Sequence, residues 1–294
     1  MPARGSRLRV GIVGAGRVGS VLGAAFARAG HEVIAVSAVS PESLRRARRW
    51  LPDVPIRSPD EVVAAAKLVL LAVPDDALAG LVAALAATNS WRAGQLVAHT
   101  SGAHGVAVLS PATARGGSGL ALHPVMTFTG RPEDLDRVAG AAFGVTAWPE
   151  SRAVAEALVL ELGGEPIWVP ETARPLYHAA LAMGANHLVT LVNDALDVLR
   201  AAGVERPDQL LAPLLSAALD NALRLGDDAL TGPVARGDAA TVAQHVATLS
   251  GAAPEVVAPY AALARRTAQR AAARGRLPAD RVEQIMGVLD ARGA

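Results

Sequence analysis

The segment "LRVGIVGAGRVG" constrains the fold of this chain more than any other feature. Residues 8–13 form a short apolar run rich in β-branched side chains, which is typical of a buried parallel strand. Gly14, Gly16 and Gly19 follow it as G-x-G-x-x-G. The first glycine permits a tight turn, the second lets backbone N–H groups approach an anion, and the third lets the next helix pack closely. The segment therefore predicts a strand–turn–helix unit whose helix N-terminus binds the pyrophosphate of a dinucleotide.

Six further short apolar segments carry the pattern of buried strands, and helical patterns lie between many of them. They cover residues 31–36, 68–73, 95–100, 119–124, 142–147 and 166–169. Strands that alternate with helices are typical of an α/β fold with a doubly wound parallel sheet. Beyond residue 170 only helical periodicity continues, broken by turn-rich segments. We therefore expect a Rossmann nucleotide-binding domain at residues 1–170 and an all-α domain at residues 171–294.

Charge and composition exclude several classes of partner. The formal net charge is +1 and no basic run is long, so a nucleic-acid partner is not expected. The chain has no cysteine, and no histidine motif with metal-ligand spacing is present, so we predict no metal site. No apolar run approaches the roughly 18 residues of a membrane helix. No signal segment precedes the first strand, so we expect a cytoplasmic protein without a membrane partner.

The end of the second strand bears on the choice between NAD and NADP. An NAD-binding domain usually carries an acidic residue there, about 20 residues after the glycine motif. This chain has Ser37 at that place, followed by Ser40 and Arg45. Hydroxyl groups and a guanidinium suit a 2′-phosphate, so the sequence favours NADP. Alternatively, Arg45 and its neighbour Arg46 lie on a solvated helix face.

Three polar segments stand at the ends of later strands: "AVPDDAL", "HTSGAHG" and "HPVMTF". In open α/β sheets the ligand binds beyond the carboxyl ends of the strands, so these segments should border the crevice. Ser101 and His123 are thus candidates for contact with a ligand, although each histidine alternatively has a structural role. The predicted cofactor-binding residues are Gly14, Ala15, Gly16, Arg17, Val18, Gly19, Ser37, Ser40, Arg45, Val73, Pro74, Asp75 and Thr100.

Residues 174–196 read as one long apolar helix that nevertheless carries three polar side chains. At about 100° per residue, His178, Asn186 and Asn193 share one arc of the helix. Burying them against apolar neighbours would cost roughly 1–3 kcal/mol for each unsatisfied group. The arc therefore predicts a helix that faces a ligand-filled cleft; the alternative is hydrogen bonding to neighbouring helices.

The turn-rich segment "LTGPVARGDAATVAQH" carries further candidates. Thr231 and Arg236 could hold the carboxylate of a 2-oxo acid, because such a group is best bound by a guanidinium and hydroxyls. Asp238 could instead pair with Arg236 and cap the start of a helix.

These segments carry a resemblance to a known group of proteins. "HAALAMGANHLVTL" resembles the end of the catalytic helix of the 6-phosphogluconate dehydrogenase-like superfamily, which includes ketopantoate reductase. In that enzyme the helix carries Lys-x3-Asn-x3-Asn; here Asn186 matches the second asparagine, His178 falls on the lysine and Ala182 on the first asparagine. The blocks "HTSGAHG", "HPVMTF", "YHAA", "NHLVTL" and "LTGPVARGD" are similar to a bacterial family described as Rossmann-like with a helical C-terminal domain of formerly unknown function.

The resemblance implies an NADPH-dependent oxidoreductase that reduces a small oxo acid, with 2-dehydropantoate as leading candidate. The family's lysine donates a proton to the substrate oxygen, and Lys67, the only lysine, sits at the start of a strand. We therefore expect His178 to be the proton donor, with Tyr177 as second choice. The predicted catalytic residues are His178, Asn186 and Ser101, and the predicted substrate-binding residues are His123, Asn193, Thr231 and Arg236.

Two other functions stay open. Some relatives have names close to pyrroline-5-carboxylate reductase, so the substrate could be an imine. A protein that senses or scaffolds NADP without chemistry belongs to a different class. Relatives often pair through the helical domain, and its apolar helices should leave surface to cover, so a homodimer is expected.

Overall fold

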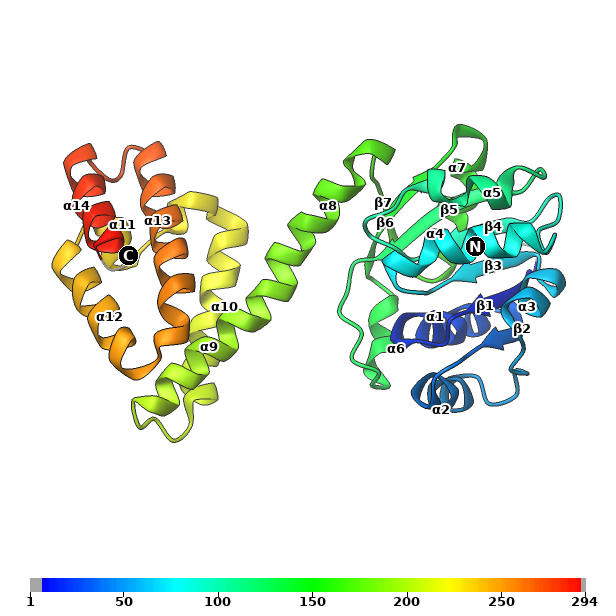
Figure 1. Cartoon of the computed structure of the whole chain (residues 1–294), viewed down its shortest axis with the longest axis horizontal. Coiled ribbons are helices and arrows are strands. Elements are labelled where there is room, and N and C mark those ends of the chain that lie inside the picture. Colours follow the sequence, from blue (N-terminus) through cyan, green and yellow to red (C-terminus); the bar gives the residue numbers. More distant parts are fainter. Residues whose placement is uncertain (1–6, 292–294) are drawn as a thin grey trace. The chain divides into compact units, whose positions relative to one another are not determined.

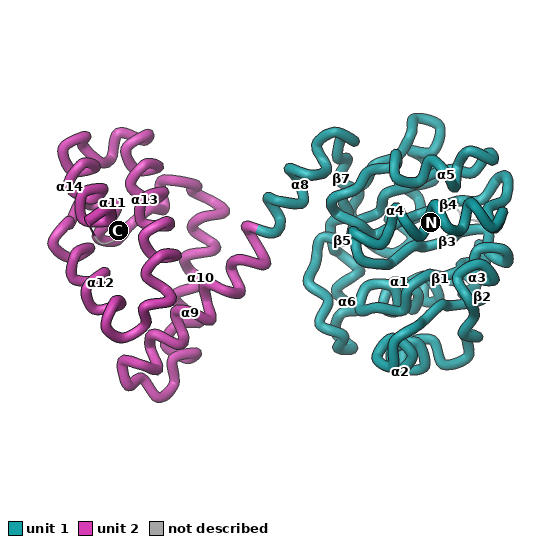
Figure 2. Tube along the Cα trace, viewed as in Figure 1, with its two compact units in different colours: residues 1–182 teal, residues 183–294 magenta. Residues whose placement is uncertain are grey.

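The computed structural model describes residues 7–291, which form two compact units (Figure 2). Unit 1 covers Met1–Ala182 and unit 2 covers Met183–Ala294. The predicted division at residue 170 marks the end of the sheet, whereas the units separate twelve residues later (182 − 170). The difference arises because the next helix makes its side-chain contacts with the sheet end of unit 1.

Unit 1 contains one seven-stranded sheet (Figure 1). Its strands are β1 (Arg9–Val13), β2 (Glu32–Ser37), β3 (Leu68–Leu71), β4 (Leu96–His99), β5 (Ser118–Pro124), β6 (Ala142–Ala147) and β7 (Glu165–Trp168). The strand order is β2-β1-β3-β4-β5-β6-β7. All seven match the apolar segments of the sequence, and the order places the crossover of a doubly wound sheet beside β1.

One strand pair departs from the predicted parallel sheet. β5 and β6 are antiparallel, with Pro124 opposite Phe143, while the other neighbours are parallel. The chain leaves β5 and returns through a segment whose only helix is α6 (Glu133–Val138). The returning chain begins β6 directly beside the end of β5, because Val125 donates a hydrogen bond of 2.8 Å to the carbonyl of Ala142. Antiparallel pairing follows from that return.

Helices cover both faces of the sheet, as the alternation of side chains in β3 demonstrates. Leu68 and Leu70 belong to one buried cluster, and Val69 and Leu71 belong to the other. Because successive strand residues point to opposite faces, each face has its own core. The helices of unit 1 are α1 (Arg17–Arg28), α2 (Pro41–Trp50), α3 (Pro59–Ala65), α4 (Asp75–Ala87), α5 (Ser110–Thr113), α6, α7 (Arg152–Glu161) and α8 (Arg174–Leu181).

Unit 2 is helical, as predicted, but only part of it has a buried core. Its helices are α9 (His187–Ala201), α10 (Pro207–Leu225), α11 (Gly232–Arg236), α12 (Ala239–Ala252), α13 (Val257–Ala273) and α14 (Ala279–Asp290). The buried cluster includes Val242, Ala268 and Ile285, and its members come from α11 to α14 and the segment before α14. By contrast, α9 buries no residue and α10 buries only Pro207. Both helices are therefore fully formed, although their apolar side chains stay accessible to solvent.

The predicted single helix over residues 174–196 is interrupted. A π-helical turn, η4 (Ala182–Asn186), separates α8 from α9. A π turn closes hydrogen bonds from residue i to i+5 and takes an extra residue, so a uniform step of about 100° does not hold through it. The arc of polar residues that we calculated with a uniform step is therefore wrong at this point. Turns of this kind often lie at functional sites.

Across residues 7–291, no helix combines the length and the apolar character needed to cross a lipid bilayer.

Candidate active site

The glycine turn after β1 packs tightly on one side and is open on the other. Gly14 has a φ of +100°, and a Cβ there would lie 2.5 Å from the carbonyl oxygen of Ala72. A Cβ on Gly19 would collide with the carbonyl oxygen of Gly14, so α1 packs tightly against the turn. Gly16 differs, because a Cβ there would meet nothing within 4 Å. The turn is thus closed toward the protein and open at Gly16.

The N-terminus of α1 offers unpaired donors at this opening. The first helical hydrogen bond runs from Ser20 N to the carbonyl of Gly16 at 3.2 Å, which leaves the amides of Arg17, Val18 and Gly19 without helical partners. No side chain caps the helix, and its first turn holds no acidic residue. Such an end favours an anion through its N–H groups and its dipole.

The residues predicted to distinguish NADP from NAD have separate tasks. Ser37 is buried, and its hydroxyl accepts a hydrogen bond from Gly14 N at 3.1 Å, so it supports the glycine turn. Ala15 N donates to the carbonyl of the same serine. Ser40 caps α2 by accepting a hydrogen bond from Ser43 N at 3.1 Å. Arg45 is exposed and forms no ion pair with any described residue, whereas Arg46 pairs with Glu42 at 2.9 Å. Arg45 is therefore the free guanidinium of the two.

Four polar side chains gather where β3, β4 and β5 end. The His178 and Asp75 side chains approach to 3.8 Å between Nδ1 and Oδ2, and each is about two-fifths exposed (41% and 37%). His123 Nδ1 forms a hydrogen bond of 2.8 Å with the Tyr177 hydroxyl. The His123 and His178 rings lie 6.1 Å apart, and a Cβ on Gly102 would touch both. The cluster joins the carboxyl edge of the sheet to α8.

The segments around this cluster are also held at their backbones. Pro74 is the N-cap of α4, which places Asp75 in the first turn of that helix. Val73 lies against the glycine turn, since a Cβ on Gly14 would be 3.1 Å from its Cγ1. Thr100 N donates to the carbonyl of Leu71 at 3.2 Å. These contacts connect the glycine turn with the polar cluster along one edge.

A sealed guanidinium lies beneath the cluster. Arg174 is 0% exposed and donates to Thr146 Oγ1 (2.8 Å) and to the carbonyls of Gly144 (2.9 Å), Ala121 (3.2 Å) and Ser101 (3.4 Å). None of these four acceptors is a carboxylate. Burial lowers the pKa of the guanidinium, while the charge of nearby Glu171 opposes that shift. The positive charge of Arg174 also acts on the neighbouring histidine rings.

Glu171 completes this support from η3 (Glu171–Ala173). Its carboxylate accepts hydrogen bonds from Val106 N (2.8 Å) and Ala107 N (3.0 Å), at the start of the 3₁₀ turn η1 (Val106–Leu109). Neither Arg174 nor Glu171 was predicted from the sequence. The motif "ETARPLYH" opens a helix, where charged residues are usually solvated, so no signal in the sequence distinguishes these two.

The two innermost histidines are neutral near pH 7. Burial lowers the pKa of His99 to about 4, and the Arg174 charge acts in the same direction. The pKa of His123 is also lowered to about 4. Burial is the main cause, and the charges of Arg174 and His178 act in the same direction. Burial raises the pKa of the Tyr177 phenol, which keeps its proton. His123 and Tyr177 thus form a neutral hydrogen-bonded pair.

Ser101 has a structural environment. Its side chain is buried, and its hydroxyl accepts a hydrogen bond from His104 N at 3.1 Å. His99, also buried, accepts from Ser101 N and bonds through Nε2 to the carbonyl of Gly105 at 2.8 Å. The predicted role of Ser101 in orienting a substrate stays a prediction, while its role in shaping this loop is visible.

The remaining predicted residues belong to unit 2. Asn186 ends the π turn and Asn193 lies on α9, both exposed. Arg236 is paired with Asp238 at 2.9 Å, the structural alternative that the sequence allowed, and Asp238 is the N-cap of α12 although its side chain makes no capping bond. Thr231 precedes α11 at its N-cap. The substrate-binding roles of these residues stay predictions.

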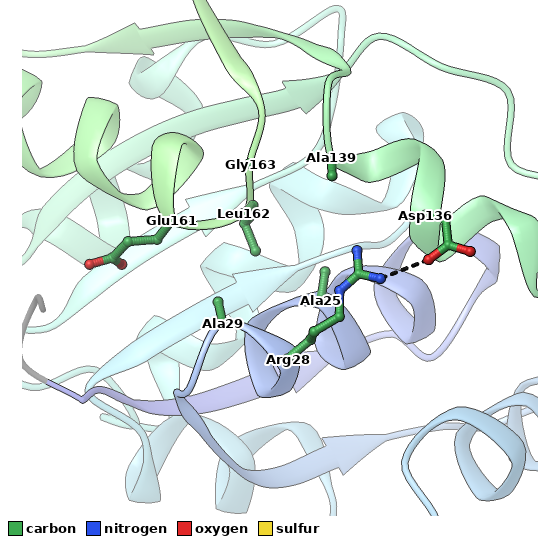
Figure 3. A pocket seen from close by; sticks show the side chains of 8 residues that line it. All are labelled: Ala25, Arg28, Ala29, Asp136, Ala139, Glu161, Leu162 and Gly163. Carbon is green, nitrogen blue, oxygen red and sulfur yellow. Dashed lines mark hydrogen bonds and ion pairs between the residues drawn. The ribbon is translucent and has the colours of Figure 1, made fainter. Parts of the chain in front are cut away.

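A separate hollow of about 300 Å³ lies at the C-terminal end of α1, the end opposite to the glycine turn (Figure 3). Ala25, Ala139 and Leu162 contribute to its wall, and an ion pair of 2.9 Å joins Arg28 and Asp136 beside it. None of the predicted site residues lines this hollow. Within the described chain, no three histidine or carboxylate side chains converge as a metal ion would require.

Comparison with known families agrees with this architecture. Residues 2–124 match the family described as a Rossmann-like domain, and residues 141–267 match a domain of unknown function, DUF2520. The chain therefore carries a Rossmann-like domain followed by a DUF2520 domain, which confirms the predicted resemblance. The second match begins just before β6, where the sheet turns antiparallel. No curated protein matches the sequence.

Three solved structures share the fold. A candidate NADP oxidoreductase from Bacteroides fragilis has 21% identity and a TM-score of 0.74, covering 90% of this chain and 98% of its own. A reductive aminase from Aspergillus terreus, in complex with NADPH and ethyl-5-oxohexanoate, has 19% identity and a TM-score of 0.64, covering 90% and 94%. A pyrroline carboxylate reductase from Plasmodium falciparum with NADP bound has 12% identity and a TM-score of 0.56, covering 90% and 98%. These likenesses confirm the predicted fold class.

The buried histidines predict a dependence of stability on pH. His99 has a pKa of about 4 when folded and 6.5 as its ordinary value, so the unfolded chain binds more protons between these pH values. Stability from this residue is fully present above about pH 6.5 and is lost as the pH falls toward 4, by on the order of 3 kcal/mol. Urea unfolding at pH 7.5, 5.5 and 4.5 measures this loss.

The His99→Gln variant is the test of that assignment. Its loss of stability between pH 7.5 and 4.5 should be smaller than that of the wild type, because glutamine does not titrate. His187→Gln, at an exposed position on α9, should retain the wild-type slope. Equal slopes for His99→Gln and the wild type would contradict the assignment.

Proposed function

We propose that this protein is an NADPH-dependent reductase that reduces the C=N bond of a small imine. The observation that carries the choice is the charge of the polar cluster: the carboxylate of Asp75 faces His178, with the neutral His123–Tyr177 pair beside them. A protonated imine is a cation, and the nearby carboxylate of Asp75 stabilises it. The names of the reductive aminase and the pyrroline carboxylate reductase with the same fold refer to the reduction of C=N bonds, which supports an imine substrate.

The residues present fit the cofactor. The open backbone at Gly16 and the unpaired amides of α1 suit the pyrophosphate, and the free guanidinium of Arg45 suits a 2′-phosphate. When bound, NADPH supplies a hydride. The support for NADPH over NADH is the serine at the end of β2 together with Arg45.

The protein's own groups have distinct tasks in this proposal. Asp75 stabilises the positive charge of the iminium group, and His178 beside it holds the substrate nitrogen by hydrogen bonding. The carbon of the C=N bond accepts the hydride while the electron pair of that bond moves to nitrogen, so a protonated imine leaves as an amine without a further proton. His123 and Tyr177 position the cluster and donate one hydrogen bond to the ligand.

A small oxo acid such as 2-dehydropantoate is the second candidate, and one observation favours it: His178 next to a carboxylate is a suitable proton donor for a carbonyl oxygen. Its carboxylate would need a free cation. Arg174 is enclosed and Arg236 is paired with Asp238, so neither guanidinium offers that charge. Binding of NADP without chemistry is the third candidate, and it predicts no NADPH oxidation.

Substrate class is tested by measuring NADPH oxidation with a cyclic imine, 1-pyrroline, and with 2-dehydropantoate. We expect the imine to be reduced with the higher kcat/KM. Asp75→Asn should lower kcat/KM for the imine about tenfold or more, because the cation loses its counter-charge. His178→Ala should have a small effect with the imine, since that substrate arrives protonated.

The oxo acid gives the opposite pattern if it is the substrate. His178→Ala would then lower its turnover about 10²-fold, because the oxygen loses its proton donor, and Asp75→Asn would have little effect. Asp76→Asn, the next residue along α4, is the matched control and should leave both reactions unchanged. Absence of NADPH oxidation with imines and oxo acids would reject the reductase.

The glycine turn gives an independent test of the cofactor. Gly16→Ala puts a methyl group into the opening and should weaken NADPH binding about tenfold or more while stability stays near that of the wild type. Gly14→Ala forces alanine to a φ of +100° and should destabilise the fold by roughly 1–3 kcal/mol. Calorimetry and urea unfolding separate the two effects; unchanged NADPH affinity in Gly16→Ala would contradict the site.

We further propose that the chain forms a homodimer through α9 and α10. Leu210, Leu214, Leu219 and Leu223 of α10 are 53–80% exposed, and Val189 of α9 is 57% exposed. At about 100° per residue, Leu210 and Leu214 share one face of α10, and Leu219 and Leu223 share the opposite face. A second copy of the chain that covers these faces would remove the leucines from water, which favours association.

Light scattering during gel filtration tests the dimer. The wild type should elute with twice the monomer mass of 30.0 kDa, and a double variant with Leu214→Glu and Leu223→Glu should elute as a monomer. Leu160→Glu is the control, because that exposed leucine lies on α7 of unit 1. A wild-type protein that is monomeric at tens of micromolar would refute the proposal.

A further inference from the structure

Unit 2 contains a large apolar cavity of its own. Its volume is about 730 Å³, within the range of roughly 300–1,000 Å³ typical of small-molecule sites. The wall is formed by α9, α12 and α13 together with two residues of α11, one residue of α10 and two residues between the helices. Aliphatic side chains such as Val198, Leu249 and Leu263 make up most of it. All of these residues belong to unit 2, so the cavity is independent of the polar cluster in unit 1.

One face of α9 is directed to this cavity. Leu191, Asp194, Ala195, Val198 and Leu199 line it, at the i, i+3, i+4, i+7 and i+8 spacing of a single helix stripe. Such a stripe normally packs into a core, yet α9 buries no residue. The stripe therefore borders open space, and that space is large enough for a ligand.

The polar groups of the wall are few and of definite character. The carboxylate of Asp194 forms no hydrogen bond or ion pair with any residue in the described part of the chain. His245 Nδ1 forms a hydrogen bond of 2.9 Å with the Tyr260 hydroxyl, and the two rings meet edge to face. Burial raises the pKa of Tyr260, so its phenol keeps its proton. One unpaired carboxylate and one hydrogen-bonded histidine–tyrosine pair thus border an aliphatic space.

We propose that this cavity binds a small apolar amine. The ammonium group lies on the Asp194 carboxylate, where a counter-charge is missing, and the aliphatic body lies against the stripe of α9 and the facing side chains of α12 and α13. The His245–Tyr260 pair offers a hydrogen bond to a second polar atom of the ligand. An anionic ligand would be repelled by this carboxylate, and a neutral one would gain no charge interaction from it.

The cavity is distinct from the surface that we assign to a second copy of the chain. Leu210, Leu214, Leu219 and Leu223 of α10 do not line it. Occupation of the cavity by a side chain of that second copy is the competing possibility, and the experiment below distinguishes it. The proposal does not depend on the reductase activity, because a binding measurement needs no turnover.

The chain has two tyrosines, one in each unit, which makes fluorine NMR a direct readout. In protein labelled with 3-fluorotyrosine, Tyr260 reports on this cavity and Tyr177 reports on the polar cluster, and Tyr260→Phe assigns the signals. Cyclohexylamine should shift the Tyr260 signal in a saturable manner. Cyclohexanol and cyclohexanecarboxylate, which share the ring and lack the ammonium group, should bind at least tenfold more weakly.

Two substitutions on α9 test the role of the charge. Asp194→Asn should weaken binding of cyclohexylamine at least tenfold, as read from Tyr260, and should leave the weak binding of cyclohexanol unchanged. Asp197→Asn is the matched control, because this exposed carboxylate is paired with Arg200 on the same helix and does not line the cavity. Circular dichroism verifies that both variants are folded.

Three results would overturn the proposal. Cyclohexylamine and cyclohexanol could shift the Tyr260 signal with equal affinity, or Asp194→Asn could bind the amine as the wild type does. Binding could also be absent in the wild-type dimer and present in the monomeric variant with Leu214→Glu and Leu223→Glu, which would assign the cavity to a second copy. A shift of Tyr177 alone would place amine binding in unit 1 and reject this site.

Discussion

The candidate active site depends on the enclosed guanidinium of Arg174. It connects β5, β6 and the loop after β4 through four hydrogen bonds to uncharged acceptors, and it anchors α8, which carries Tyr177 and His178. A buried cation whose hydrogen-bond acceptors are all uncharged is costly, so the surrounding carbonyls must stay in place to solvate it. The same charge disfavours protonation of His123 and His99. Arg174 thus fixes the geometry of the cluster, and its charge adds to the effect of burial, which is the main reason that both histidines are neutral.

The two halves of the site rest on different physical principles. At the glycine turn, backbone conformation and the absence of side chains create the opening, and Ser37 of β2 secures it by accepting hydrogen bonds from Gly14 N and Ala15 N. At the polar cluster, side chains from α4, β5 and α8 meet over Gly102, and their positions depend on contacts between distant segments. Unit 2 adds a third feature, because its helices carry apolar side chains that its own buried core does not cover.

The sequence predicted the strands and the glycine turn well because each has a local signal, and it predicted the roles of single polar residues less well. Ser101 and Ser40 are short polar residues whose side chains bond to nearby backbone, and the local pattern would be the same if they bound a ligand. His178 was predicted to be the proton donor, and its side chain lies where β3, β4 and β5 end. Its partner Asp75 was assigned to the cofactor, because no sequence pattern joins residues about a hundred positions apart.

The sequence by itself determined the strand positions, the nucleotide-binding turn and the change to helices after residue 170, since hydrophobic periodicity and glycine conformation act over a few residues. Only the tertiary structure decided that β6 runs antiparallel, that a π turn interrupts the helix after α8, and that Arg174 is sealed beneath the histidines. Those outcomes depend on which segments far apart in the sequence pack together and share hydrogen bonds. Such contacts form only in the complete fold, so no short stretch of the sequence predicts them.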